Sequence, residues 1–194
     1  MILPDSARVE VTDSYLPHAR ALNGSGDSVA APLFWSSLDT AFIKVLDSTT
    51  GLSLADSVGT GRLQARVEAI RSNPQAITIL SRLDTMFAPG PELSTVTAPD
   101  STSDSLVVHA NATGGQAVNR RVVYAATTYP PGGSTLTFVP NDTVVTSSTG
   151  DAAVQIKFVA GTLPDSVVVL ATMRRPDGTS IPGSPVKFVV EFLP

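Results

Sequence analysis

The sequence contains no cysteine and only two histidines among its 194 residues. Without cysteine the chain can form no disulfide and no thiolate zinc site, and no thiol can act as a nucleophile. A catalytic triad or dyad needs a base, and a stable metal site needs three or four converging ligands, whereas His18 and His109 lie far apart in the sequence. We therefore expect no catalytic residue and no metal ligand. We interpret His109, in the middle of a predicted strand, as a partly buried structural residue.

Charged residues are also scarce. Asp, Glu, Lys and Arg make up 15% of the chain, whereas about 25% is usual for soluble domains. The net charge is -4 and Lys and Arg form no run, so we expect no nucleic-acid partner. Serine and threonine take the place of charged residues. This composition is typical of extracytoplasmic β-proteins, and an interface-rich subunit of a larger assembly would show the same bias.

Long apolar runs are absent as well. No stretch approaches the about 20 residues that cross a bilayer as a helix. The first residues, MILPDSARVEV, lack the basic and apolar regions of a signal peptide, which indicates a mature or trimmed chain or one made in the cytoplasm. No glycine-rich loop leads into a helical pattern, so no phosphate site is predicted. We expect no transmembrane segment, no cofactor and no small-molecule substrate.

The sequence does contain a regular series of short apolar stretches, separated by clusters of Gly, Pro, Asn, Asp and Ser about every ten residues. This spacing is typical of stacked antiparallel strands and predicts an all-β fold. Residues 62–70 also show helical spacing, but strict alternation and the glycines before them favour a strand. The expected strands are residues 7–12, 31–36, 41–46, 52–55, 62–70, 76–80, 105–112, 120–127, 135–139, 152–159, 165–173 and 186–193.

Residues 86–104 divide these strands into two sets. The segment has three prolines, one glycine and a hydroxyl-rich end, which is typical of a stiff connector. We therefore predict two domains, residues 1–85 and 105–194, joined by residues 86–104 as a linker together with the first strand of the next domain. A weak repeat supports the division, because DSTTGLSLA and SSTGDAAVQI both place a glycine, Gly51 or Gly150, before an alternating strand. Each glycine would supply the positive φ of a tight turn.

Alternation also predicts which side chains form the core of the second domain. Two of its strands, VVVL at residues 167–170 and FVVEF at residues 188–192, are apolar on both faces. Their outer face therefore meets a neighbour, or an edge is covered. The predicted core residues are Val122, Tyr124, Phe138, Val154, Ile156, Phe158, Val167, Val169, Phe188 and Val190.

Both halves resemble bacterial immunoglobulin-like (Big) domains. The second half, with SLVVHANATGGQAVNRRVVYA and TVVTSSTGDAAVQIKFVAGTLPDSVVVLATM, is similar to the invasin and intimin type, Big group 1, although no proline precedes Val118. The first half, with WSSLDTAFIKVLDSTTGLSLADSVGTGRLQARV, is similar to Big group 2. The resemblance implies two tandem immunoglobulin-like β-sandwich domains. It also implies that Trp35 is a core aromatic, that residues 36–39 form a turn and that Gly51 is a hairpin glycine. The family has a further strand upstream of residues 7–12, so the first domain would be incomplete at its N-terminus or borrow a strand.

Three loops carry aromatic or proline residues suited to protein contacts: SYLPHAR, MFAPGP and TTYPPGG. The alternative is that Tyr15 and Tyr129 close their own sandwiches, and that Met86 and Phe87 cap one domain or lie between the two. Most aspartates stand in turns, which they shape by local hydrogen bonds. A calcium site at Asp84, Asp100 and Asp104 is the less favoured alternative. The candidate partner contacts are Tyr15, Leu16, Met86, Phe87, Tyr129 and Pro130.

These observations favour a non-enzymatic structural or scaffold protein that makes protein contacts outside the cytoplasm, in the periplasm or on the surface of a bacterium. Our leading hypothesis is an accessory subunit on the outer face of a larger envelope or membrane complex, photosynthetic and respiratory complexes included. The alternatives are a fragment of a cell-surface adhesin and a decoration protein of a virion capsid or tail. A carbohydrate-binding module would need an exposed aromatic platform, and the assignment of the one tryptophan to a core argues against it.

Overall fold

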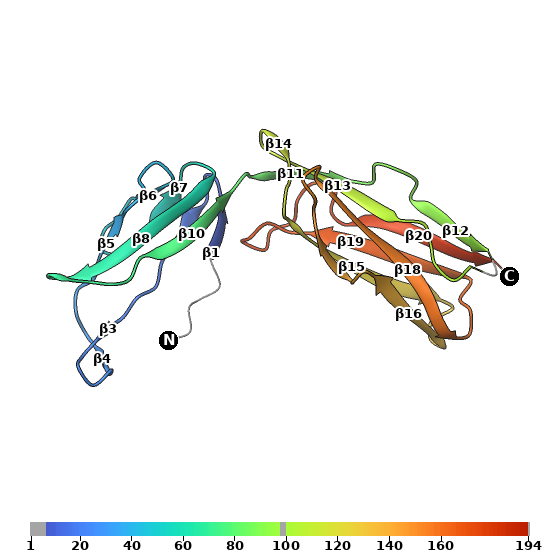
Figure 1. Cartoon of the computed structure of the whole chain (residues 1–194), viewed down its shortest axis with the longest axis horizontal. Helices are drawn as coiled ribbons and strands as arrows, with labels where there is room; N and C mark the ends of the chain where they lie inside the picture. Colours follow the sequence, from blue (N-terminus) through green and yellow to red (C-terminus); the bar gives the residue numbers. More distant parts are fainter. Residues whose placement is uncertain (1–6, 98–99, 194) are drawn as a thin grey trace. The chain divides into compact units, whose positions relative to one another are not determined.

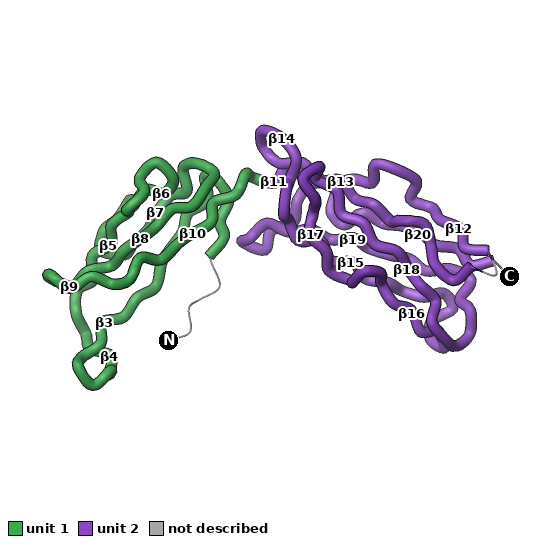
Figure 2. Tube along the Cα trace, in the orientation of Figure 1, with its two compact units in different colours: residues 1–82 green, residues 83–194 purple. Residues whose placement is uncertain are grey.

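The computed structural model describes residues 7–97 and 100–193. The chain forms two compact units, residues 1–82 and residues 83–194 (Figure 2). All regular secondary structure in the described residues is β-strand (Figure 1), which confirms the predicted all-β class. The described part of the chain has no helix long and apolar enough to cross a membrane.

Unit 1 is a sandwich of two sheets. One has the strand order β1-β10-β8-β5, with β1 parallel to β10, and the other has the order β2-β7-β6. The run β10-β8-β5 matches strands G, F and C of an immunoglobulin sandwich, and β2-β7-β6 matches strands B, E and D. The bounds are β1 (Ala7–Glu10), β2 (Ser14–Tyr15), β5 (Phe34–Ser37), β6 (Ile43–Val45), β7 (Ser53–Ala55), β8 (Gly59–Val67) and β10 (Gln75–Leu80). Three short strands are not part of these two orders. β3 (Ala21–Leu22) and β4 (Ser28–Val29) pair with each other, and β9 (Ile70–Arg71) pairs with β8.

Trp35 lies in the core of unit 1, as predicted. Its side chain is buried together with Ile43, Leu63 and Ile77. Gly51, in the connection between β6 and β7, has φ +82°, and a Cβ added there would lie 2.7 Å from Cδ1 of Trp35. The hairpin glycine is therefore needed both for its backbone conformation and for the space that the indole occupies.

The connection after Trp35 differs from the prediction. Ser36 and Ser37 belong to β5, and the turn covers residues 38–42 instead of 36–39. The reason is the pairing of β5 with β8, which extends to Ser37 opposite Leu63. Residues 62–67 are in β8, so the strand interpretation of this segment is confirmed.

Unit 2 is a larger sandwich with the same strand order. Its sheet β11-β13-β18-β16 corresponds to strands A, B, E and D, and β20-β19-β15 corresponds to G, F and C. β12 pairs parallel with β20, as β1 does with β10, and β17 extends the sheet beside β15. The bounds are β11 (Leu83–Phe87), β12 (Leu93–Thr97), β13 (Leu106–Ala112), β14 (Gly115–Gln116), β15 (Arg121–Tyr129), β16 (Ser134–Val139), β17 (Thr143–Val145), β18 (Asp151–Gly161), β19 (Ser166–Met173) and β20 (Val186–Leu193).

The two units share a sheet order but not every strand. Within residues 7–82, unit 1 has no strand equivalent to β11, and residues 1–6 lie outside the described part of the chain. Gly51 and Gly150 both precede strand E of their unit and both have positive φ, +82° and +84°. This equivalence confirms the role predicted for the two glycines.

The boundary between the units differs from the predicted linker. Residues 86–104 contain the end of β11 and all of β12, which pair with β13 and β20 of unit 2. Met86 and Val96 point into the core of that unit, where they are 1% and 3% exposed. Two of the three prolines that suggested a linker, Pro89 and Pro91, stand between β11 and β12, where the chain passes from one sheet of the sandwich to the other. Unit 2 therefore begins at Leu83.

The core of unit 2 is the predicted one. Of the predicted core residues, eight are fully buried and the other two, Phe138 and Phe158, are half-buried against them. Tyr124 lies at the centre, where its hydroxyl donates a hydrogen bond to the carbonyl of Ala152 at 2.9 Å. Burial raises the pKa of Tyr124, so this phenol stays protonated and acts as a hydrogen-bond donor that joins the two sheets.

Candidate interaction surfaces

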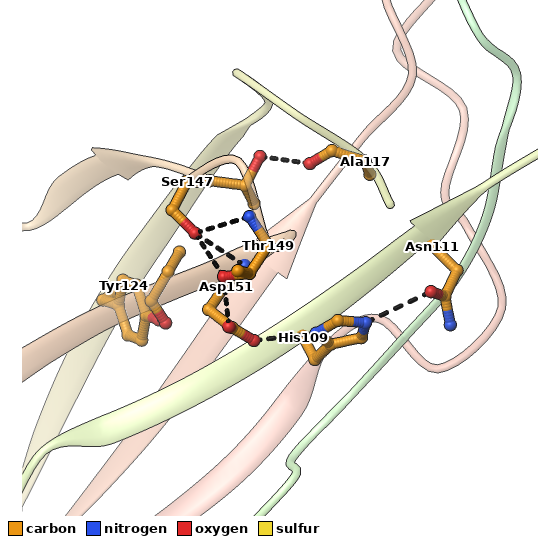
Figure 3. Close-up of polar contacts among 9 residues, drawn as sticks. His109, Asn111, Ala117, Tyr124, Ser147, Thr149 and Asp151 are labelled. Atoms are coloured by element: carbon orange, nitrogen blue, oxygen red, sulfur yellow. Dashed lines mark hydrogen bonds and ion pairs between the residues drawn. The ribbon is translucent and has the colours of Figure 1, made fainter. Parts of the chain in front are cut away.

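A polar cluster around His109 is the arrangement in unit 2 that most resembles a catalytic site (Figure 3). His109 Nδ1 lies 2.7 Å from Oδ1 of Asp151, and Nε2 lies 3.1 Å from Oδ1 of Asn111. Thr149 Oγ1 donates to Oδ2 of Asp151 at 2.6 Å and is 2.7 Å from Oγ of Ser147. Thr149 and then His109 lower the pKa of Asp151.

This cluster lacks the geometry of a nucleophilic triad. In a triad the hydroxyl contacts the imidazole nitrogen opposite the carboxylate. Here the hydroxyls of Ser147 and Thr149 lie on the carboxylate side, and Asn111 occupies the other nitrogen of His109. The contacts join β13 to the turn before β18, which agrees with the structural role predicted for His109.

The three aspartates of the possible calcium site do not converge. Asp84 follows Leu83, which pairs with Ala112 at the end of β13, whereas Asp104 precedes the start of that strand and contacts Ser94. Seven residues of strand separate the two positions by about 20 Å. Within the described ranges, no three acidic or histidine side chains lie close enough to hold a metal ion. The calcium alternative is therefore wrong for these residues.

The six predicted contact residues have different environments. Met86 is buried in the core of unit 2, so it is not available to a partner and that prediction is corrected. Tyr15 is half-buried, and its hydroxyl accepts a hydrogen bond from Nε2 of Gln75 at 2.9 Å; desolvation raises the pKa of this phenol. Tyr15 thus closes its own sandwich, which was the alternative interpretation. The remaining predicted contacts are exposed and stay candidates: Leu16, Phe87, Tyr129 and Pro130.

Unit 1 has a hairpin arm that was not predicted from the sequence. Strands β3 and β4 pair with each other between β2 and β5, and they extend away from the two sheets of the unit (Figure 1). Residues 18–30 are all exposed except Ala21, which is half-buried. Asn23 closes the turn, because its Oδ1 accepts hydrogen bonds from the backbone N–H groups of Ser25 and Asp27, both at 2.9 Å. The arm has local order but contributes nothing to the core of unit 1.

The arm lies at the same end of unit 1 as a second exposed apolar residue. β9 folds back on the end of β8, where Val67 pairs with Ile70, and Ile70 is 77% exposed. The arm connects strands B and C, and β9 lies in the connection between F and G. In immunoglobulin sandwiches these two connections meet at one end, and Figures 1 and 2 show them so here. We define the arm end as the exposed apolar residues Leu22, Val29 and Ile70.

A second exposed apolar surface lies on the five-stranded sheet of unit 2. Along β15, β19 and β20 buried side chains alternate with outward-facing ones, and many of the outward ones are apolar too. This confirms the prediction that β19 and β20 are apolar on both faces. The only charged residues of the five strands are Arg121, Lys187 and Glu191. We define the outer sheet face by its apolar members Leu93, Val123, Ala125, Tyr129, Val145, Val168, Leu170, Val189 and Leu193.

Comparisons with known proteins gave structural likenesses only. A scan against protein-family models and a search of curated proteins both found no match. The Yersinia pseudotuberculosis adhesin InvE is similar over 96% of this chain and 56% of its own, with 16% identity and a TM-score of 0.45. Fibronectin(III)-like modules of Clostridium thermocellum CbhA are similar over 96% of this chain and 90% of theirs, with 11% identity and a TM-score of 0.41. Domains 4 and 5 of the S-layer protein SbsC are similar over 91% of this chain and 80% of theirs, with 14% identity and a TM-score of 0.38.

These scores are too low to support an argument about function, and this chain spans little more than half of the InvE structure. The immunoglobulin-like fold of both units rests on their own strand order. The assignment of the two halves to Big groups 2 and 1 stays a prediction.

Proposed function

We propose that this protein is a non-enzymatic structural module outside the cytoplasm that binds another protein, as an accessory subunit of a larger envelope or membrane assembly. The observation that carries the proposal is the arm end of unit 1. A hairpin inserted between strands B and C exposes Leu22 and Val29 on a projection that unit 1 does not need for its core. The F–G turn, at the same end of the unit, exposes Ile70.

The energetics favour a contact role for these side chains over a structural one. Full burial of a Val, Leu or Ile side chain stabilises a complex by about 1.5–3 kcal/mol. The side chains of the arm end are exposed and do not belong to the core of unit 1, so their burial is available to stabilise a complex. An isolated two-stranded hairpin is marginally stable in water, so a partner that packed against it would also hold its conformation. Loops carried on a rigid sandwich are where binding residues concentrate.

The composition supports the proposed location. Serine and threonine replace charged side chains over the whole chain, as is typical of extracytoplasmic β-proteins. The sequence resemblance to bacterial immunoglobulin-like domains points the same way, to the periplasm or the cell surface.

Site-specific photocrosslinking in native cell envelopes tests the proposal. A photoreactive amino acid is placed at position 22 or 70, and for a matched control at Thr60, which is exposed at the start of β8 in the same unit. We expect one discrete crosslinked product of defined mass from positions 22 and 70 and none from position 60. The substitutions Leu22→Asp and Val29→Asp should abolish the product from position 70 without changing the unfolding temperature of unit 1. Equal crosslinking from all three positions, or none from the arm end, would contradict the proposal.

A further inference from the structure

The outer sheet face of unit 2 has a regular arrangement of rows across its strands. The pairing registers place Leu93, Val189, Val168 and Thr127 side by side in a central row. On one side of this row lie Lys187, Leu170 and Ala125, and on the other lie Glu191, Ser166 and Tyr129. The two flanking rows are therefore the same distance from the centre.

The charges of these rows are arranged so that the face is complementary to itself. Lys187 and Glu191 stand two residues before and two residues after Val189 on β20, each about 7 Å from it. A twofold axis that lies in the contact plane, crosses the strands and passes over Val189 would place a second copy antiparallel on the first. Lys187 of each copy would then face Glu191 of the other, which is the repeated pairing of an isologous interface.

The sizes of the side chains match under the same operation. Tyr129 of one copy would lie over Ala125 of the other, and Leu170 over Ser166, so a large side chain meets a small one at both positions. Val168 and Val189 of the two copies would meet at the centre. Packed sheets cross at about 30°, which moves each charge by roughly 3–4 Å, and the Lys187 side chain is long enough to span that shift.

We propose that the outer sheet face binds a second copy of this chain through a twofold-symmetric interface centred on Val189. The inference goes beyond the proposed function and does not rest on it, because it uses another unit and other residues. Five strands and the eight residues of β20 give a contact of roughly 600 Å² per copy, at the lower end of standard interfaces. A dimer with a micromolar dissociation constant is expected.

Charge exchange across the interface tests this symmetry. Lys187→Glu places a second carboxylate against Glu191 of the other copy, and Glu191→Lys places two lysines together, so each variant alone should dimerise at least roughly tenfold more weakly. In an equimolar mixture, the heterodimer sets the two carboxylates of one variant against the two lysines of the other, so an ion pair forms at both symmetric positions. The double variant Lys187→Glu/Glu191→Lys forms both ion pairs in its own homodimer. We expect the mixture, as a heterodimer, and the double variant, as a homodimer, each to regain the dimer that the single variants lose, measured by sedimentation velocity on the full chain over a concentration series.

Two controls separate the dimer from folding and from the arm end. Thr137→Asp changes an exposed residue on the other sheet of unit 2, and Leu22→Asp changes the arm; neither should alter the dissociation constant. Leu170→Asp should abolish the dimer, with circular dichroism and the unfolding temperature showing that unit 2 remains folded. A wild-type chain that stays monomeric at about 100 times the expected micromolar range, or single charge variants that the double variant does not rescue, would overturn the inference.

Discussion

At the scale of single residues, Gly51 and Trp35 depend on each other. Gly51 and Gly26 have nearly the same φ, +82° and +88°, but a Cβ would meet Trp35 at Gly51 and nothing within 4 Å at Gly26. An alanine at either position costs about 1–2 kcal/mol for the left-handed conformation. At Gly51 it also displaces the indole, which adds about 1–3 kcal/mol.

We therefore expect Gly51→Ala to destabilise unit 1 by at least about 1 kcal/mol more than Gly26→Ala. Trp35 is the one tryptophan of the chain, so its fluorescence during urea unfolding reports on unit 1 alone. Equal losses for the two variants would show that the contact with Trp35 does not limit this turn.

Asp47 in the same turn makes unit 1 sensitive to acid. Thr49 donates to this carboxylate from its hydroxyl and its backbone N–H, and Thr50 from its hydroxyl, which lowers the pKa of Asp47 from 3.8 to about 2. A carboxyl whose pKa is lower in the folded state contributes stability above its unfolded pKa, near pH 4, and loses that contribution as the pH falls toward 2. Thr49→Val should raise the pKa of Asp47 toward 3.8 in an NMR titration. Asp47→Asn should flatten the loss of unit 1 stability between about pH 4 and pH 2, and an unchanged acid profile would contradict this account.

At the scale of strands, β11 and β12 decide where unit 2 begins. They bring Leu83, Met86 and Val96 into its core. The fragment 83–194 should therefore fold cooperatively, whereas the fragment 105–194 should lose those three buried side chains and leave the neighbouring strands β13 and β20 unpaired on that side. Urea unfolding followed by circular dichroism distinguishes the two, and a cooperative transition for fragment 105–194 would contradict the boundary.

The strands that could be predicted from the sequence are those with several alternating residues. Every predicted strand is present, because burial of one face gives each of them a period of two, as in β8 and β15. Three of the missed strands, β3, β4 and β9, have two residues each and cannot show a period. The five residues of β11 were missed because buried and exposed side chains do not alternate along it. Residues 86–104, which contain β12, were assigned to a linker together with the first strand of the next domain, because prolines precede β12 and hydroxyl residues surround Val96.

The candidate surfaces, too, could be predicted from the sequence only in part. The outer sheet face follows from the apolar sequences VVVL and FVVEF, although the rows across it depend on strand registers that the sequence alone does not define. The Asn23-Gly24 pair is a hairpin signal, but only the structure shows that the hairpin packs against none of the core of unit 1. Met86 was misassigned because an apolar residue beside prolines has the same local sequence whether it is buried or exposed.

At the scale of the whole chain, two units repeat one strand order and differ in what they expose. Unit 1 has an arm inserted between strands B and C, and unit 2 has a broad apolar sheet face with few charges. The two surfaces belong to different units and are built from different residues, so substitutions can separate binding of a partner protein from self-association.

The central claim is that the protein acts through contact of the arm end with another protein. Photocrosslinking from position 22 in native envelopes tests it most directly, with position 60 on β8 as the reference. We expect a single product of defined mass from position 22 and none from position 60. No product from position 22, while the protein is present and folded in the same envelopes, would contradict it.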